Sequence, residues 1–313
     1  MANLRDVRLR MRAIEQTLQV TKAMHLISTS KLRKGRRMLE DTVPYFKRIQ
    51  KSMYDILSSE SYIQSEFFRK SAVASSGSAS GGASGSTSGE SEKVHTAIIV
   101  VTSDKGLAGG YNANVFRHVN ELCSKVKNPM LILIGAIGYR YFAHTPQIIL
   151  ENFSFHSQMP TLEHAEEITE YVVSQYLWGS LDEIHIVYTH MFNAIKMLPV
   201  EHQIIPVVKE KIQSELYEIG GEKRVDLKFE FMPSPEAVFD ALVPQYMKGV
   251  IYGAMVEAYA SEQSARMSAM DEASKSAEDM LGSLQISYNR ARQAGITQEM
   301  SEIVGGSTAL ADR

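Results

Sequence analysis

The sequence has few of the features that mark secreted, membrane-spanning or disulfide-stabilised proteins. Its 313 residues include a single cysteine, Cys123, so the chain can form neither an internal disulfide nor a thiolate metal cluster. Its longest apolar runs, residues 97–101 and 130–138, are far shorter than the ~20 residues that a membrane span requires. The first residues, MANLRDVRLRMR, are too charged for a signal peptide. We therefore expect a protein of a reducing compartment that does not cross a bilayer by itself.

Proline is nearly absent from the C-terminal part of the chain, where Pro244 is the only one between residues 237 and 303. Within this stretch, apolar and small residues recur at alternating steps of three and four, which is the heptad spacing of a coiled-coil seam. Such a seam predicts one long helix whose apolar face needs a partner. The seam residues are Met267, Met270, Ser274, Ala277, Leu281, Leu284, Tyr288 and Ala291.

The N-terminal part predicts a second long helix, from residue 3 to about residue 57, which Pro44 is expected to kink or interrupt. It carries a seam of the same spacing, so pairing of the two helices is the economical arrangement, because each seam then covers the other. The residues of this second seam are Leu4, Val7, Met11, Ile14 and Leu18, continued by the smaller or more polar Thr21, His25 and Ser28.

The middle of the chain has a different pattern. Residues 71–92 are almost entirely Ser, Gly and Ala and predict a flexible loop. From residue 94, short β-branched runs alternate with helical periodicity, which indicates an α/β sheet domain. Strands are expected at residues 96–102, 130–134, 148–153, 183–189, 199–207 (returning antiparallel) and 227–231, and helices at 112–126 and 162–178, before Ser234 caps the last helix.

These patterns together predict the fold class and its division into domains. We expect an α/β protein in which a long antiparallel coiled coil of the N- and C-terminal helices carries an inserted Rossmann-like α/β domain. The paired helices would comprise residues 1–57 and 234–313, the loop residues 71–92, and the α/β domain residues 93–233.

Charge is distributed unevenly along the chain. Residues 1–51 contain 13 basic and four acidic residues, a net charge of +9, which leaves −12 for the rest of a chain whose total is −3. A basic helix suggests an acidic protein surface or a nucleic acid as partner, or else a solvated helix face. Nucleic-acid binding would need aromatic or base-reading side chains among the basic ones, and this segment offers only Tyr45 and Phe46.

The glycine-rich segment SDKGLAGGYN, residues 103–112, raises the alternative of a nucleotide-dependent enzyme, because α/β proteins bind phosphates at such turns. It matches neither G-x-G-x-x-G nor the P-loop, and tight turning explains its glycines equally well. His185 and His190 flank a predicted strand and are expected to be structural, and the nine histidines show no metal-ligand spacing. The residues therefore indicate no catalytic site, metal site or cofactor.

Three segments, however, resemble the gamma subunit of F-type ATP synthases. They are VTKAMHLISTSKLRK (residues 20–34), the SDKGLAGGYN loop, and the C-terminal stretches SEQSARMSAM (261–270) and YNRARQAGITQEMSEIV (288–304). Their order and the predicted long helices match this family over nearly the full length. Departures are modest: Ala108, Gly295, Gly305 and Ser307 differ from the residues common in the family, and residues 71–92 look like an insertion.

The resemblance implies a role as the rotor shaft of the central stalk, without catalytic residues or cofactor of its own and in one copy per complex. The implied partners are the alpha and beta subunits of a hexamer, the epsilon subunit and the membrane ring of c subunits, with no nucleic acid. The implied location is peripheral, on the cytoplasmic face of the cell membrane.

The family's coupling contacts with the beta subunits fall on Met24 in the first helix and on Arg292, Gln293 and Thr297 in the last. A further basic contact patch, facing acidic surfaces of the beta subunits or the ring, would comprise Lys31, Arg33, Lys34, Arg36 and Arg37.

Overall fold

The computed structural model describes residues 4–59, 65–68, 94–153, 159–193, 196–207 and 231–311. The predicted loop at 71–92 lies outside these residues, as does the predicted strand at 227–231 apart from Phe231, which is in no strand. The chain divides into two compact units, one of residues 1–30 with 266–313 and one of residues 31–265. The division of the sequence into paired helices and an α/β domain remains a prediction.

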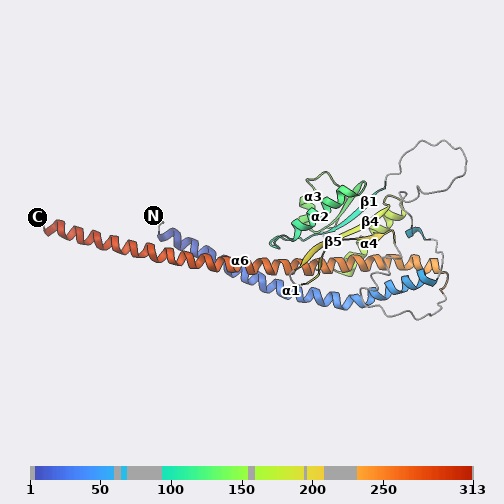
Figure 1. The fold of residues 1–313 in the computed structure, drawn as a ribbon, viewed down its shortest axis with the longest axis horizontal. Coiled ribbons are helices and arrows are strands. Elements are labelled where there is room, and N and C mark those ends of the chain that lie inside the picture. Colours follow the sequence, from blue (N-terminus) through green and yellow to red (C-terminus); the bar gives the residue numbers. More distant parts are fainter. Residues whose placement is uncertain are drawn as a thin grey trace. The chain divides into compact units, whose positions relative to one another are not determined.

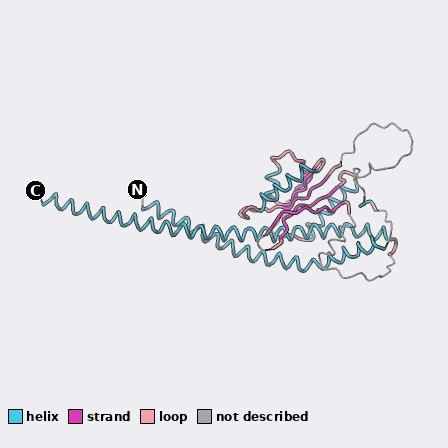
Figure 2. Tube along the Cα trace, viewed as in Figure 1, coloured by secondary structure: helices cyan, strands magenta, loops and turns pink. Residues whose placement is uncertain are grey.

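Residues 31–265 contain one five-stranded sheet (Figure 2). Its strands are β1 (Thr96–Val101), β2 (Pro129–Ile134), β3 (Ile148–Phe153), β4 (Glu183–Met191) and β5 (Met197–Ile205), in the order β3-β2-β1-β4-β5. The first four run parallel and β5 returns antiparallel along β4, as the sequence predicted. All six residues of β1 are buried, as expected for a central parallel strand with helices on both faces.

Helices cover both faces of this sheet (Figure 1). On one face, α2 (Tyr111–Lys125) and α3 (Ala136–Phe142) pack on Ile98 and Val100 of β1. On the other face, α4 (Leu162–Leu177) and the parts of the two long helices that belong to this unit form the larger core. The sequence did not predict α3 or the short 3₁₀ helix η1 (Glu66–Phe68).

The two long helices are α1 (Leu4–Ser59) and α6 (Pro235–Ala311). Ser234 caps α6 as predicted, because its Oγ accepts the Ala237 N–H at 3.2 Å. Of the two effects predicted for Pro44, a kink or an interruption, the interruption is wrong, since α1 continues through this residue. Proline has no N–H, so the carbonyl of Glu40, four residues earlier, lacks its usual helical hydrogen bond. Because Pro44 and Glu40 are both exposed, water can hydrate this carbonyl instead.

In the unit of residues 1–30 and 266–313, burial follows the two predicted seams. Between residues 4 and 23, the only side chains that are not exposed are Leu4, Val7, Met11, Ile14, Leu18 and Thr21. Between residues 275 and 304 they are Ala277, Leu281, Leu284, Tyr288 and Ala291. The heptad positions are therefore confirmed as the covered face of each helix.

Polar contacts join these two faces and give their direction. Arg8 Nη2 donates to Tyr288 Oη at 2.6 Å, and the buried Ser274 Oγ donates to Thr21 Oγ1 at 2.8 Å. Residue numbers rise on one helix as they fall on the other, so the two helices run antiparallel here.

Candidate functional site

The glycine-rich loop lies at the carboxyl end of β1 and is held by a reciprocal side-chain contact. The Ser103 N–H donates to Asn112 Oδ1 at 3.1 Å, and Asn112 Nδ2 donates to Ser103 Oγ at 2.7 Å. Gly109 adopts a positive φ of 56°, which a glycine tolerates without strain. Tight turning therefore accounts for at least this glycine.

The sheet order places a topological switch point between β1 and β4, where α/β proteins bind ligands outside the carboxyl ends of the strands. In this protein α6 fills that place. Tyr111 Oη donates to the Ala258 carbonyl at 3.3 Å, and Ser261 Oγ donates to the Thr189 carbonyl at 2.9 Å.

Between α6 and the carboxyl ends of β1 and β2 lies a cavity of about 10 Å³, lined by Thr102, Tyr111, Ile134, Ala258 and Tyr259 among others. Such a volume holds at most a single water molecule. A nucleotide cannot enter the crevice while α6 occupies it, which argues against the nucleotide-dependent enzyme at this position.

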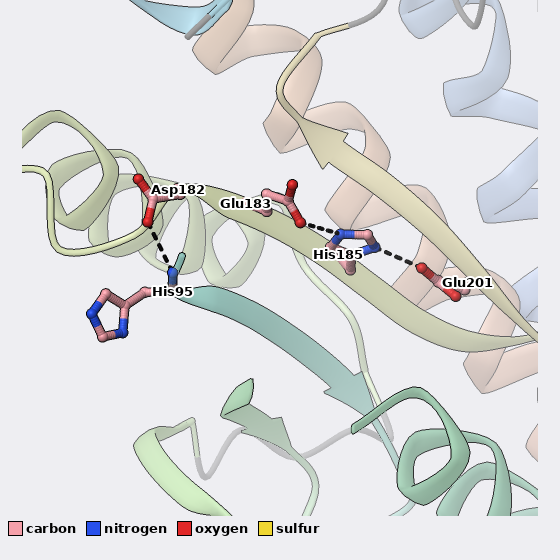
Figure 3. A network of polar contacts seen from close by, with 5 residues as sticks. All are labelled: His95, Asp182, Glu183, His185 and Glu201. Atoms are coloured by element: carbon pink, nitrogen blue, oxygen red, sulfur yellow. Dashed lines mark hydrogen bonds and ion pairs between the residues drawn. The ribbon is translucent and has the colours of Figure 1, made fainter. Parts of the chain in front are cut away.

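Both histidines of β4 lie close to carboxylates, and Figure 3 shows the first of them, His185. His185 Nδ1 lies 2.7 Å from Glu201 of β5, and its Nε2 lies 3.8 Å from Glu183. Asp182 Oδ2 accepts the His95 N–H at 2.8 Å, which joins the starts of β1 and β4. His190 Nδ1 lies 2.6 Å from Glu257 of α6. Contacts of this kind connect β4 to β5 and to α6. They are consistent with the expectation that His185 and His190 are structural.

Within the described ranges, no cluster of His, Cys, Asp and Glu side chains has the arrangement of a metal site. In the same part of the chain, no helix is both long and apolar enough to span a bilayer.

The predicted coupling residues of the last helix lie on its exposed end. Every residue from Arg292 to Val304 is exposed, because the paired stretch ends at Ala291. The side chains of Arg292 and Gln293 project from adjacent helical positions, and Thr297 lies one turn beyond Gln293. Thr297 Oγ1 donates to the Gln293 carbonyl at 2.9 Å, which still leaves its oxygen able to accept a hydrogen bond from a partner.

The structure does not bring Met24 together with these three residues. Met24 is half-buried on α1, next to His25. The pKa of the Asp271 carboxyl on α6 is lowered mainly by its hydrogen bond to Lys275 and by the charge of Lys275. His25 of α1 also lowers this pKa, so His25 lies near Asp271 and this part of α1 is level with it. Arg292 is almost six helical turns further along α6, about 30 Å away. The predicted coupling residues therefore form two separate contact levels.

The predicted basic patch lies on α1 within the unit of residues 31–265. Arg33, Arg36 and Arg37 are exposed and share one side of the helix, because they are three and four residues apart. Lys34 is also exposed, whereas Lys31 is half-buried. Arg36 Nη2 lies 3.9 Å from Met191 Sδ at the end of β4, a weak contact that leaves its charge available.

One of the two aromatic residues near this patch is already engaged. The Phe46 ring packs against Tyr252 of α6 with centroids 6.3 Å apart and belongs to the periphery of the main core. It cannot stack on a base, so only Tyr45 remains for the nucleic-acid alternative.

Sequence reasoning missed an exposed apolar row beside the polar coupling residues. Ile296, Met300 and Ile303 are each more than half exposed and lie four and three residues apart, on one side of α6. The spacing of these three residues was visible in the sequence, but the residues themselves are not in register with the heptad seam that ends at Ala291. Such a row adds apolar area to the exposed end of α6, which makes this end a candidate surface for another protein.

The fold and these exposed surfaces together define the class of this protein. It is a mixed α/β protein with a mostly parallel sheet and a very long C-terminal helix, whose candidate site is a helix surface and not a pocket.

Comparison with known proteins identifies the family. Residues 3–310 match the sequence profile of the family described as ATP synthase. The ATP synthase gamma chain of Ruminiclostridium cellulolyticum is 40% identical over 309 residues, which cover 98% of this chain and 99% of the relative. That of Acetivibrio thermocellus is 39% identical over 314 residues, covering 99% and 100%. This chain belongs to the ATP synthase gamma chain family.

Solved structures agree on the fold. The rotor of the Euglena gracilis mitochondrial ATP synthase has a chain similar to this one, with a TM-score of 0.60 and 15% identity over 94% of this chain and 98% of that chain. A chain of the Tetrahymena thermophila mitochondrial ATP synthase central stalk and c-ring has a TM-score of 0.57 and 24% identity over 82% and 99%.

Proposed function

We propose that this protein is the central rotor subunit of an F-type ATP synthase. It has no catalytic role of its own and couples ion flow through a membrane ring to ATP synthesis and hydrolysis in an alpha/beta hexamer. The observation that carries the proposal is the exposed polar end of α6, from Arg292 onward, beyond a stretch in which the seams of both helices are covered. A helix end that exposes polar and apolar side chains together offers a surface to a surrounding protein.

The mechanism is differential binding. An asymmetric shaft presents a different face to each of three beta subunits, and each face stabilises a different conformation of the catalytic site there. Turning the shaft therefore changes nucleotide affinity at the three sites in sequence. The chain needs no nucleotide pocket of its own for this work.

The shaft itself is proposed to be an antiparallel coiled coil of residues 1–57 and 234–313. The covered heptad positions of both helices support it, together with the contacts of Arg8 with Tyr288 and Thr21 with Ser274. Residues 93–233 would form a Rossmann-like foot, supported by four parallel strands with helices on both faces. This foot would bind the epsilon subunit and the ring of c subunits.

The contact residues divide by level. Arg292, Gln293 and Thr297 would bond to a loop of a beta subunit, where the Arg292 guanidinium can hold a carboxylate through two parallel hydrogen bonds. Met24 would meet the hexamer at the second level, about 30 Å along the shaft. Lys31, Arg33, Lys34, Arg36 and Arg37 would face acidic surfaces of the beta subunits or the ring. One copy per complex would lie at the cytoplasmic face of the cell membrane, held there by the ring.

A paired substitution tests the coupling role. We expect Arg292→Ala with Gln293→Ala to lower the ATP hydrolysis rate of the assembled complex about tenfold, since losing charge-assisted hydrogen bonds that form during turnover costs about 1.4 kcal/mol or more. The matched control is Asn289→Ala with Arg290→Ala, which removes an exposed amide and an exposed guanidinium one turn earlier. Both variants should unfold at the wild-type temperature, and equal turnover in the two would exclude the coupling role.

Purification from the native source tests the assembly. The chain should copurify with a hexameric ATPase and with the membrane ring. Recovery of the chain without a hexamer, or bound to nucleic acid in a salt-dependent way, would contradict the rotor function.

A further inference from the structure

Two glycines inside the long helices lie directly against aromatic rings. Glycine is a poor helix former, so its presence in a helix interior needs a reason. A Cβ atom at Gly249 of α6 would lie 2.5 Å from Cε1 and 2.8 Å from Cγ of Phe46. A Cβ atom at Gly35 of α1 would lie 3.0 Å from Cδ1 and 3.3 Å from Cε1 of Tyr259. At both positions the missing side chain makes room for a ring.

The two contacts are reciprocal. Phe46 of α1 lies on Gly249 of α6, and Tyr259 of α6 lies on Gly35 of α1. Both are within residues 31–265, and on each helix they are about three turns, or 15 Å, apart. Because each helix supplies one ring and one glycine, sliding or rolling of either helix moves a ring off its glycine and onto a neighbouring side chain.

The rings cannot turn aside easily. Phe46 lies between Tyr45, with centroids 5.2 Å apart, and Tyr252, with centroids 6.3 Å apart. Tyr259 is buried. Interiors at native packing density resist such displacements, so the rings hold the two helices in one register.

Other glycines of α6 show that the fit is specific. Gly253, one turn after Gly249, has nothing within 4 Å of the place where a Cβ would stand, and the same is true of Gly282 and Gly295. An alanine at Gly253 therefore adds the same methyl group to the same helix without meeting a ring.

We propose that the Phe46–Gly249 and Tyr259–Gly35 contacts are a register lock between α1 and α6 that lets the two helices carry torque together. The inference rests on the proposed rotor function. Phe46, Tyr259 and their glycines are positioning residues: they touch no nucleotide and act by keeping α1 and α6 from slipping when one end of the shaft is turned against the other.

The test is a measurement of torsional stiffness in the assembled complex. The hexamer is fixed to a surface, and a probe is attached to the foot through Cys123, the one thiol of this chain. The angular variance of the probe is recorded while the catalytic sites are held by a non-hydrolysable nucleotide. Phe46→Leu and Gly249→Ala are compared with Gly253→Ala and wild type.

We expect the angular variance to rise about twofold in Phe46→Leu and Gly249→Ala and to stay at the wild-type value in Gly253→Ala. Phe46→Leu removes the ring without overfilling the site, so it keeps the test valid if Gly249→Ala fails to fold. A lower melting temperature with unchanged variance would show a merely structural role and overturn the lock. A wild-type chain that enters no rotating hexamer would instead overturn the rotor function, and the lock with it.

Discussion

One helix, α6, has two regions that differ in every respect except their secondary structure. From Phe239 to Ser264 it lies in the main core, with Phe239, Val243, Met247 and Ile251 fully buried. From Arg292 to Val304 every residue is exposed. The buried region needs neighbours from its own chain to be stable, whereas the exposed region leaves its side chains open to a partner. Under the proposed function, stability and contact with partners are thus separated along a single helix.

The largest effect should come from the buried region. Phe239 is fully buried, and its ring stacks on Phe68 with centroids 4.8 Å apart. Phe239→Ala should lower the free energy of unfolding by about 3–5 kcal/mol. Met300→Ala in the exposed region should change it by no more than about 0.5 kcal/mol. Urea denaturation of both variants tests this, and similar losses would mean that the isolated chain already buries Met300.

A smaller effect on stability is expected at Ser274, which lies between the two regions of α6 and donates a buried hydrogen bond to Thr21 of α1. Ser274→Ala should lower the free energy of unfolding by about 1 kcal/mol. Adding Thr21→Val should cost less than the sum of the two single changes, because both changes remove the same hydrogen bond between Ser274 and Thr21 and it can be lost only once. A double-mutant cycle measured by urea denaturation gives the coupling, and strict additivity would show that the bond does not form in solution.

The pH dependence of stability offers a third test, in the part of α1 that joins the sheet. Burial raises the pKa of the Asp55 carboxyl, against the opposing charge of Lys51. The folded state therefore keeps this proton to a higher pH than the unfolded state does, and stability is lost as the pH rises through the folded pKa.

Asp55→Asn removes that loss. We expect the variant to melt at a higher temperature than wild type at pH 7 and to lose this advantage as the pH is lowered toward 4. Thermal melts over this range measure the difference, with Asp41→Asn, at an exposed position of the same helix, as control. An advantage of Asp55→Asn that does not change with pH would contradict the stated cause.

The smallest effect is expected for the exposed ion pair of Lys22 with Glu278, whose charged atoms lie 2.7 Å apart on side chains that are 57% and 52% exposed. Glu278→Gln should change the free energy of unfolding by about 0.5 kcal/mol or less. Melting in 1 M salt should remove even this difference, because the charges are then screened. A larger, salt-resistant loss would show that the pair is less exposed than the structure indicates.

Much of the local structure could be predicted from the sequence. The β-branched run of β1 predicted a buried strand, and the steps of three and four predicted which positions of α1 and α6 are covered. Ser234 was recognisable as a cap because Pro235 follows it. These features depend on neighbouring residues and on helical or strand periodicity, which the sequence displays directly.

Other features depended on contacts between residues far apart in the chain. Pro44 was expected to kink or interrupt the first helix, yet the helix continues through this exposed residue. The glycine-rich loop left a nucleotide site open, and only the passage of α6 across the switch point closes that crevice. Nothing in the sequence around Gly249 shows that the Phe46 ring lies on it.

The sequence by itself therefore determined most of the elements, the covered faces of the long helices and the family. Tertiary structure alone decided what fills the space beside the sheet, which glycines receive a ring, and that Met24 and Arg292 lie at different levels of the paired helices. The physical reason is that periodicity shows which face of an element is buried but not what covers it. That depends on which distant residues meet there.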